Sequence, residues 1–115
     1  MKKILPWLLW LWLSAVIVAA FYYAPTFKGF KGESGRVLFF HVPMAWVSFT
    51  AFILAAFWSL LYLVRKGADG SRDLRHDRKA AAAVELGLVF GVLATVTGAL
   101  WAKIEWGAYW NWDPR

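Results

Sequence analysis

The sequence contains no cysteine, so this chain forms no disulfide, thiolate metal site or thioether bond to a prosthetic group. Charge is also scarce, because only 17% of the 115 residues are Asp, Glu, Lys or Arg. By contrast, 61% are hydrophobic and 19% aromatic, with nine Trp, which is more apolar surface than a soluble domain of this size can bury. The basic residues flank apolar runs, as is typical of membrane proteins, so the net charge of +6 predicts a lipid partner and no nucleic acid.

Three uncharged or nearly uncharged runs predict three membrane-spanning helices. The runs cover residues 4–24, 37–64 and 80–102. Each is long enough to cross a hydrocarbon core of about 30 Å. The middle run would extend about 42 Å as a helix, so we expect its spanning part at 40–64 and its first turns, including His41 and Pro43, at the interface. The predicted fold is an all-α membrane protein, a single membrane domain over 1–115.

The first run has an alternative interpretation as a cleaved signal peptide. Lys2 and Lys3 precede it, and Val18-Ala19-Ala20 resembles a cleavage site. The run is longer than the roughly 7–15 apolar residues usual for such a peptide, and the aromatic residues at 21–23 resemble an interfacial belt. We therefore favour a retained anchor.

Basic residues predict the orientation of the helices. Eight Lys and Arg precede the first run or lie in 65–79, against five in 25–39 and 103–115. Because the more basic side faces the cytoplasm, we expect a cytoplasmic amino terminus and a cytoplasmic loop at 65–79. The loop 25–39, His41 and the segment 103–115 then share the outer side.

The third run carries small residues at helical spacing, namely Gly87, Gly91, Thr95 and Gly98. Such a face allows close approach of another helix. We expect it to pack against the first two helices of this chain; pairing with another subunit is the alternative. Asp77 or Ser71 is expected to cap this helix.

Chemistry is expected in the segment after the third run, which is dense in large aromatic side chains. Within seven positions it contains Trp106, Tyr109, Trp110 and Trp112, interrupted by Gly107 and Asn111. Interfacial anchoring explains an ordinary Trp cluster. This density also suits a platform for a planar macrocycle such as heme, with indole N–H groups free for polar edges.

His41 is the second candidate, because neutral imidazole is the commonest protein ligand of heme iron. Pro43 should bias Val42 out of the helical region and so direct the ring. An interfacial or capping role is the alternative. His76 is a poor second ligand, because it belongs to the opposite loop. Basic side chains on the predicted outer side could neutralise heme propionates or serve only as interfacial charges; they are Lys28, Lys31, Arg36, Lys103 and Arg115.

Two segments resemble a known family. Trp106-Gly-x-x-Trp110-x-Trp112-Asp113 resembles the tryptophan-rich signature of the heme-handling proteins of cytochrome c biogenesis. Arg36-Val-Leu-Phe-Phe-His41-Val-Pro-Met-Ala-Trp46 is similar to the preceding segment in one branch, the cytochrome c maturation protein C family, also called heme exporter protein C. The resemblance runs over the whole chain.

The resemblance implies a multi-pass protein of the bacterial inner membrane that binds heme b non-covalently. It implies delivery of heme at the outer face to a periplasmic heme chaperone, together with ATP-binding cassette subunits A and B and the small membrane protein D of the same system. It assigns His41 as an axial iron ligand and five residues as heme contacts: Trp106, Gly107, Trp110, Trp112 and Asp113. Members of this family have six membrane helices and a second axial His in a later outer loop, so the chain is expected to be the first half of such a bundle.

Two other functions remain as alternatives. One is a fragment of a heme lyase or cytochrome c synthetase, although no site for substrate thiols is visible, so we do not expect an enzyme. The other is a structural membrane protein whose Trp residues only anchor helices.

Overall fold

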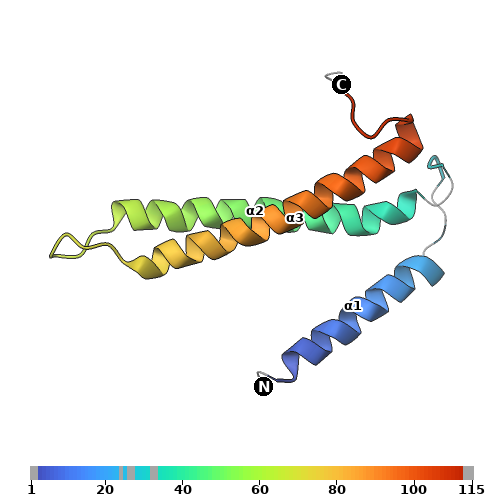
Figure 1. Cartoon of the computed structure of the whole chain (residues 1–115). Helices are drawn as coiled ribbons and strands as arrows, with labels where there is room; N and C mark the ends of the chain where they lie inside the picture. The colour runs from blue at the N-terminus through green and yellow to red at the C-terminus, as the bar shows by residue number, and fades with distance from the viewer. Residues whose placement is uncertain (1–2, 24, 26–27, 32–33, 113–115) are drawn as a thin grey trace.

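The computed structural model describes all residues except 1–2, 24, 26–27, 32–33 and 113–115. The described residues form three helices and no strand: α1 (Leu5–Tyr22), α2 (Gly35–Val64) and α3 (Leu74–Trp106). All three are long and apolar enough to cross a membrane. The predicted all-α membrane fold with three spanning helices is therefore confirmed (Figure 1).

α2 and α3 extend beyond the apolar runs that predicted them, whereas α1 lies within the first run. α2 begins at Gly35 rather than near residue 40, and α3 covers Leu74–Trp106 rather than 80–102. For these two helices the runs mark only the part that is free or nearly free of charge, whereas the backbone stays helical through the flanking charged and aromatic residues. The expected loop 65–79 thus shortens to residues 65–73.

Asp73 caps α3, so the expectation of a cap at Asp77 or Ser71 was wrong. The Asp73 carboxylate accepts a hydrogen bond from the Arg75 backbone N–H at 2.9 Å. The Ser71 hydroxyl instead donates to Asp69 at 2.6 Å. Asp73 has the extended backbone of a capping position, and Asp77 lies inside the first turn, where its charge faces the helix dipole.

Pro43 lies inside α2, and Val42 is helical. The expectation that proline would bias Val42 out of the helix was therefore wrong. Proline's φ is compatible with a helix, and membrane helices tolerate it. The direction of His41 must then come from its packing against α3.

α2 and α3 cross closely along the stripe of small residues (Figure 1). A Cβ atom added at Gly87 would lie 3.0 Å from the Phe52 ring, and one at Gly91 would lie 3.1 Å from the Ser48 hydroxyl. Ser48 donates a hydrogen bond to the Gly87 carbonyl at 2.8 Å. Packing within the chain is confirmed for α2, but α1 takes no part in it.

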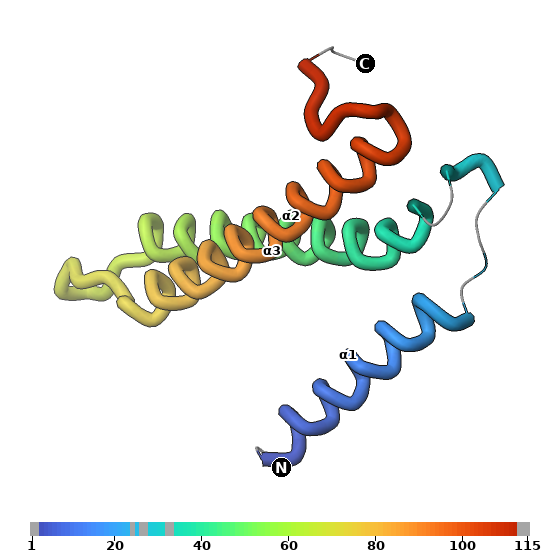
Figure 2. The backbone as a smooth tube through the Cα atoms, turned by 45° about the vertical axis from the view of Figure 1, so that its right-hand side comes forward, coloured from blue at the N-terminus to red at the C-terminus, as the bar shows by residue number. Residues whose placement is uncertain are grey.

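Among the described residues, α1 meets the rest of the chain only near its carboxyl end (Figure 2). There the Arg36 guanidinium donates to the Phe21 carbonyl at 2.8 Å and also bonds the Ala20 carbonyl, and the Phe21 ring lies 6.2 Å from that of Phe40. The radius of gyration is 19.3 Å, against about 13 Å for a compact domain of similar length. The chain is therefore an open arrangement of helices.

Alanine supplies every buried hydrophobic side chain among the described residues: Ala20, Ala51, Ala55, Ala80, Ala83, Ala94 and Ala102. Most of the large apolar side chains are exposed instead. This distribution is the reverse of that in a soluble domain, and it suits a surface covered by lipid or by further helices.

Candidate functional site

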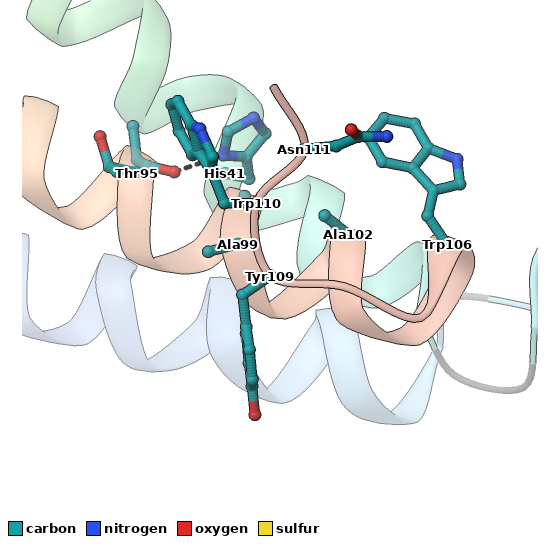
Figure 3. A pocket seen from close by; sticks show the side chains of 10 residues that line it. His41, Thr95, Ala99, Ala102, Trp106, Tyr109, Trp110 and Asn111 are labelled. Carbon is teal, nitrogen blue, oxygen red and sulfur yellow. Dashed lines mark hydrogen bonds between the residues drawn. The ribbon is translucent and has the colours of Figure 1, made fainter. Parts of the chain in front are cut away.

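A pocket of about 830 Å³ opens where α2 and α3 diverge, at the end of the pair that carries His41 (Figure 3). We call this end the His41 end, and the opposite one, at the α2–α3 turn, the His76 end. α2 contributes His41. α3 contributes Ala94, Thr95, Gly98, Ala99, Ala102 and Trp106, and the segment after it contributes Tyr109, Trp110 and Asn111.

Gly107 turns the chain back toward this pocket. It ends α3 in the left-handed conformation, with φ at +82°, and its N–H donates to the Lys103 carbonyl at 3.1 Å. The Lys103 ammonium donates to the Gly107 carbonyl at 2.9 Å. Because glycine adopts positive φ without the steric cost of a Cβ, the following residues reverse and lie beside α3 instead of extending it (Figure 2).

His41 projects from α2 onto the backbone of α3. Its Nδ1 lies 2.8 Å from the Ala94 carbonyl oxygen and 3.2 Å from the Thr97 hydroxyl. The ring rests on Gly98, where an added Cβ would lie 2.8 Å from His41 Cε1. Two contacts and one close approach therefore fix the ring at the wall of the pocket.

The tryptophan residues of the signature differ in their contacts. Trp106 and Trp110 line the pocket, and Trp106 also packs against Trp101, with ring centroids 5.0 Å apart. Trp112 packs edge-on against Trp110 at 5.6 Å, is 89% exposed and is not part of the lining. Asp113, and Arg115 beyond it, lie outside the described residues.

Sequence reasoning missed two residues of this end, Thr97 and Glu105. Thr97 contacts His41, whereas Tyr109 and Asn111, which belong to the predicted aromatic segment but were not assigned as heme contacts, line the pocket. Glu105 joins the loop before α2 to α3, because its carboxylate accepts from the Lys31 backbone N–H at 2.7 Å and from the Ser34 hydroxyl. Lys31 and Ser34 each lie more than 70 positions from Glu105 in the sequence, so no local pattern could have indicated these bonds.

Three of the basic residues proposed for propionates bind main-chain carbonyls instead. Arg36 bonds α1, the Lys31 ammonium donates to the Glu105 carbonyl at 3.0 Å, and Lys103 bonds Gly107. Lys103 also lies 5.3 Å from the centroid of the Tyr109 ring. These bonds give the three side chains a structural role, which differs from both roles that the sequence suggested.

His76 lies in the first turn of α3, at the opposite end of the pair, stacked on Trp58 with ring centroids 5.4 Å apart and an interplanar angle of 19°. The Lys79 ammonium lies 4.1 Å from the centroid of the same Trp58 ring. This separation agrees with the expectation that His76 is not a second ligand beside His41.

No group of three His, Cys, Asp or Glu side chains among the described residues could hold a bare metal ion. A single imidazole beside aromatic rings suits instead a metal that carries its own equatorial ligands. Metalloporphyrins have this property, and their faces match indole rings. The side chains of the pocket therefore fit a heme group.

Comparison with known proteins agrees with this fit. The model of the family described as heme exporter protein C matches residues 1–115. The heme exporter protein C of Rhodobacter capsulatus is 31% identical over 98% of this chain and 45% of its own length. That of Escherichia coli strain K12 is 31% identical over 92% of the chain and 43% of its length. The cytochrome c biosynthesis ccmC-like mitochondrial protein of Arabidopsis thaliana is 30% identical over 92% of the chain and 39% of its length.

The chain spans less than half the length of these relatives. No solved structure matches it at a significant level. The family model covers every residue, including both segments whose resemblance the sequence indicated. The chain belongs to the heme exporter protein C family.

Proposed function

We propose that this chain binds heme b non-covalently in the pocket at the His41 end and presents it for delivery during cytochrome c biogenesis. One observation carries the proposal: the turn at Gly107 brings Trp110 into the same pocket as His41. The volume of about 830 Å³ lies within the range of pockets that hold small-molecule ligands and cofactors.

His41 would ligate the iron through Nε2, because Nδ1 is hydrogen-bonded to α3. Trp106 and Trp110 would contact the macrocycle, with Gly107 setting their approach, and Trp112 would support Trp110 from outside the pocket. Asp113 completes the proposed contact set on the strength of the family signature. The absence of cysteine excludes a thioether bond between heme and this chain, which supports non-covalent binding from which heme can be released and passed on.

The names of the relatives support a role in heme export and cytochrome c biosynthesis. We propose that the pocket faces the outer side of the bacterial inner membrane, with a cytoplasmic amino terminus. The recipient would be a periplasmic heme chaperone. The membrane partners would be subunits A and B of an ATP-binding cassette transporter and the small membrane protein D. We propose a handling role rather than a catalytic one, within a larger bundle of six helices.

The test is His41→Ala in the chain reconstituted in lipid nanodiscs, titrated with heme and followed by Soret absorbance. The expected result is a loss of affinity of at least about ten-fold, since loss of a ligand should exceed the effect of disturbing its supporting groups. Added imidazole should restore the spectrum by entering the vacated position.

The matched control is His76→Ala, which removes the other histidine and should leave the heme spectrum unchanged. Circular dichroism establishes that both variants remain helical. Equal heme spectra for His41→Ala and the parent chain would show that His41 is not the ligand.

A further inference from the structure

We propose that Thr97 and the Ala94 carbonyl position His41, holding it in one tautomer with the Nε2 lone pair toward the pocket. The inference deepens the proposed function and rests on it for the identity of the ligand. The tautomer itself follows from contacts within the chain and does not require any ligand.

The Ala94 carbonyl determines which nitrogen carries the proton. A carbonyl oxygen only accepts hydrogen bonds, and it lies 2.8 Å from His41 Nδ1. Nδ1 must therefore be protonated. A neutral imidazole has one N–H, so Nε2 is left with a free lone pair, which is the form that binds a metal.

Thr97 adds a second acceptor at the same nitrogen. Its hydroxyl lies 2.8 Å from the Leu93 carbonyl and 3.1 Å from the Ala94 carbonyl, and its single proton is donated within the helix. The oxygen then faces Nδ1 at 3.2 Å as an acceptor. In the other tautomer the Nδ1 lone pair would face two acceptor oxygens, which is unfavourable at a partly buried position.

The opposite edge of the ring is left for a ligand. Figure 3 shows the second nitrogen of His41 on the far side of the ring from the hydrogen bond to α3. Among the described residues, none donates or accepts a hydrogen bond at Nε2. Gly98 holds the ring close to α3, so residues 94–98 form one helical turn that bonds one edge of the imidazole and presents the other. Metal-ligating histidines commonly have this arrangement, in which one ring nitrogen binds the metal and the N–H of the other is donated to a carbonyl.

The first experiment needs no heme. We would label the chain with 15N-histidine in lipid nanodiscs and record the two ring nitrogens at alkaline pH, using His76→Gln so that only His41 contributes. The expected spectrum has a protonated Nδ1 and an unprotonated Nε2. A protonated Nε2, or an even mixture of tautomers, would overturn the proposal.

The second experiment compares Thr97→Val with Thr97→Ser and with Thr95→Val. Valine keeps the shape of threonine but accepts no hydrogen bond. Thr95 lines the same pocket, and its hydroxyl bonds the Gly91 carbonyl at 2.8 Å rather than His41, so it is a matched control. Thr97→Val should populate the second tautomer and weaken heme binding about ten-fold, the lower end for outer groups of a metal site. Thr97→Ser should resemble the parent in both readouts, and Thr95→Val should retain the tautomer of the parent, because its hydroxyl does not contact His41.

The two experiments separate the failure of this inference from that of the proposed function. If Thr97→Val leaves both the tautomer and the heme affinity at the level of the parent, Thr97 does not position the ring. If the parent chain shows the expected tautomer and binds no heme, the positioning stands and the proposed function fails.

Discussion

The two ends of the α2–α3 pair each place a histidine beside aromatic rings, yet the two histidines make opposite kinds of contact. At the His41 end, the ring edge bonds the α3 backbone through Nδ1, and the rest of the ring borders a pocket. At the His76 end, the ring face covers Trp58, and Lys79 lies on the same indole. The difference shows that aromatic neighbours alone do not make a histidine a candidate ligand, because the nitrogens must also be directed.

The chain reversal at each end accounts for this difference. At the His76 end a short turn joins α2 directly to α3, and rings of α2 meet cations of the turn and of α3, as Tyr62 does with Arg72 at 5.5 Å. At the His41 end the helices diverge, and the segment after Gly107 folds back beside α3. One end is closed by its own side chains, and the other leaves room for a ligand.

Among the variants that test the difference between the two ends, Gly98→Ala should have the largest effect on heme affinity. The new methyl group would lie 2.8 Å from His41 Cε1, so the ring must leave its place on α3 and give up its bonds at Nδ1. Heme affinity in a Soret titration should fall by more than about ten-fold. The helix should persist, since alanine is the better helix former.

Gly91→Ala is the control for that variant. Its methyl group would meet only the Ser48 hydroxyl, at 3.1 Å, and the residue lies two turns nearer the middle of the crossing. Heme binding should stay at the parent level. If both alanine variants lose heme equally, helix packing rather than the position of His41 controls binding.

Trp110→Ala and Trp58→Ala remove one indole from each end. Trp110→Ala should lower heme affinity up to about ten-fold, because an aromatic contact contributes roughly 0.5–1.5 kcal/mol beyond its buried area. Trp58→Ala should leave heme binding unchanged and lower the thermal midpoint, since His76 and Lys79 lose their partner. Unchanged heme content in Trp110→Ala would favour a role of the tryptophans in anchoring alone.

Glu105→Gln should have a smaller effect, limited to the loop at the His41 end. The amide is a weaker acceptor than the carboxylate for the Lys31 backbone N–H and the Ser34 hydroxyl. Hydrogen exchange of the Lys31 amide, read by mass spectrometry, should become severalfold faster. Exchange in the turn 65–73, at the His76 end, serves as the internal control. Faster exchange there as well would mean that the whole structure has loosened.

Asp73→Ala should have the smallest effect, at the His76 end. Hydrogen bonds from the Arg75 side chain and backbone lower the pKa of the Asp73 carboxyl below its usual 3.8. Because the pKa is lowered in the folded state, the ionised Asp73 carboxylate stabilises the folded chain fully above about pH 5. This stabilisation is lost as the pH falls through the folded-state pKa. The variant should therefore melt slightly earlier at pH 7, with the difference shrinking in acid. A difference that grows in acid would contradict this sign.

The three spans were predictable because a long uncharged run has few alternatives to a helix in lipid, whatever its neighbours do. The family was recognisable because each of its two characteristic segments is a continuous stretch of the sequence. The helix ends were not predictable to the same degree. The choice of Asp73 over Ser71 as the cap depends on where the chain leaves the turn, and the helical state of Val42 depends on α2 continuing through Pro43.

The site was only partly predictable, because it too depends on contacts between residues that are distant in the sequence. His41 and the tryptophans were candidates by residue type, and their roles as heme contacts remain predictions. Thr97 and Glu105 were missed, because each acts on a residue more than 50 positions away. Neither belongs to a pattern that distinguishes it from other polar residues near a helix end.

The sequence by itself determined that the chain spans a membrane three times and belongs to a heme exporter family, because run length, charge and contiguous motifs are local properties. Only the tertiary structure decided how the parts meet. It showed that α2 packs on α3 while α1 stands apart, that Gly107 turns the aromatic segment back, and that α3 bonds one edge of His41. These outcomes depend on contacts between distant residues, in which a missing Cβ or a single carbonyl sets the geometry.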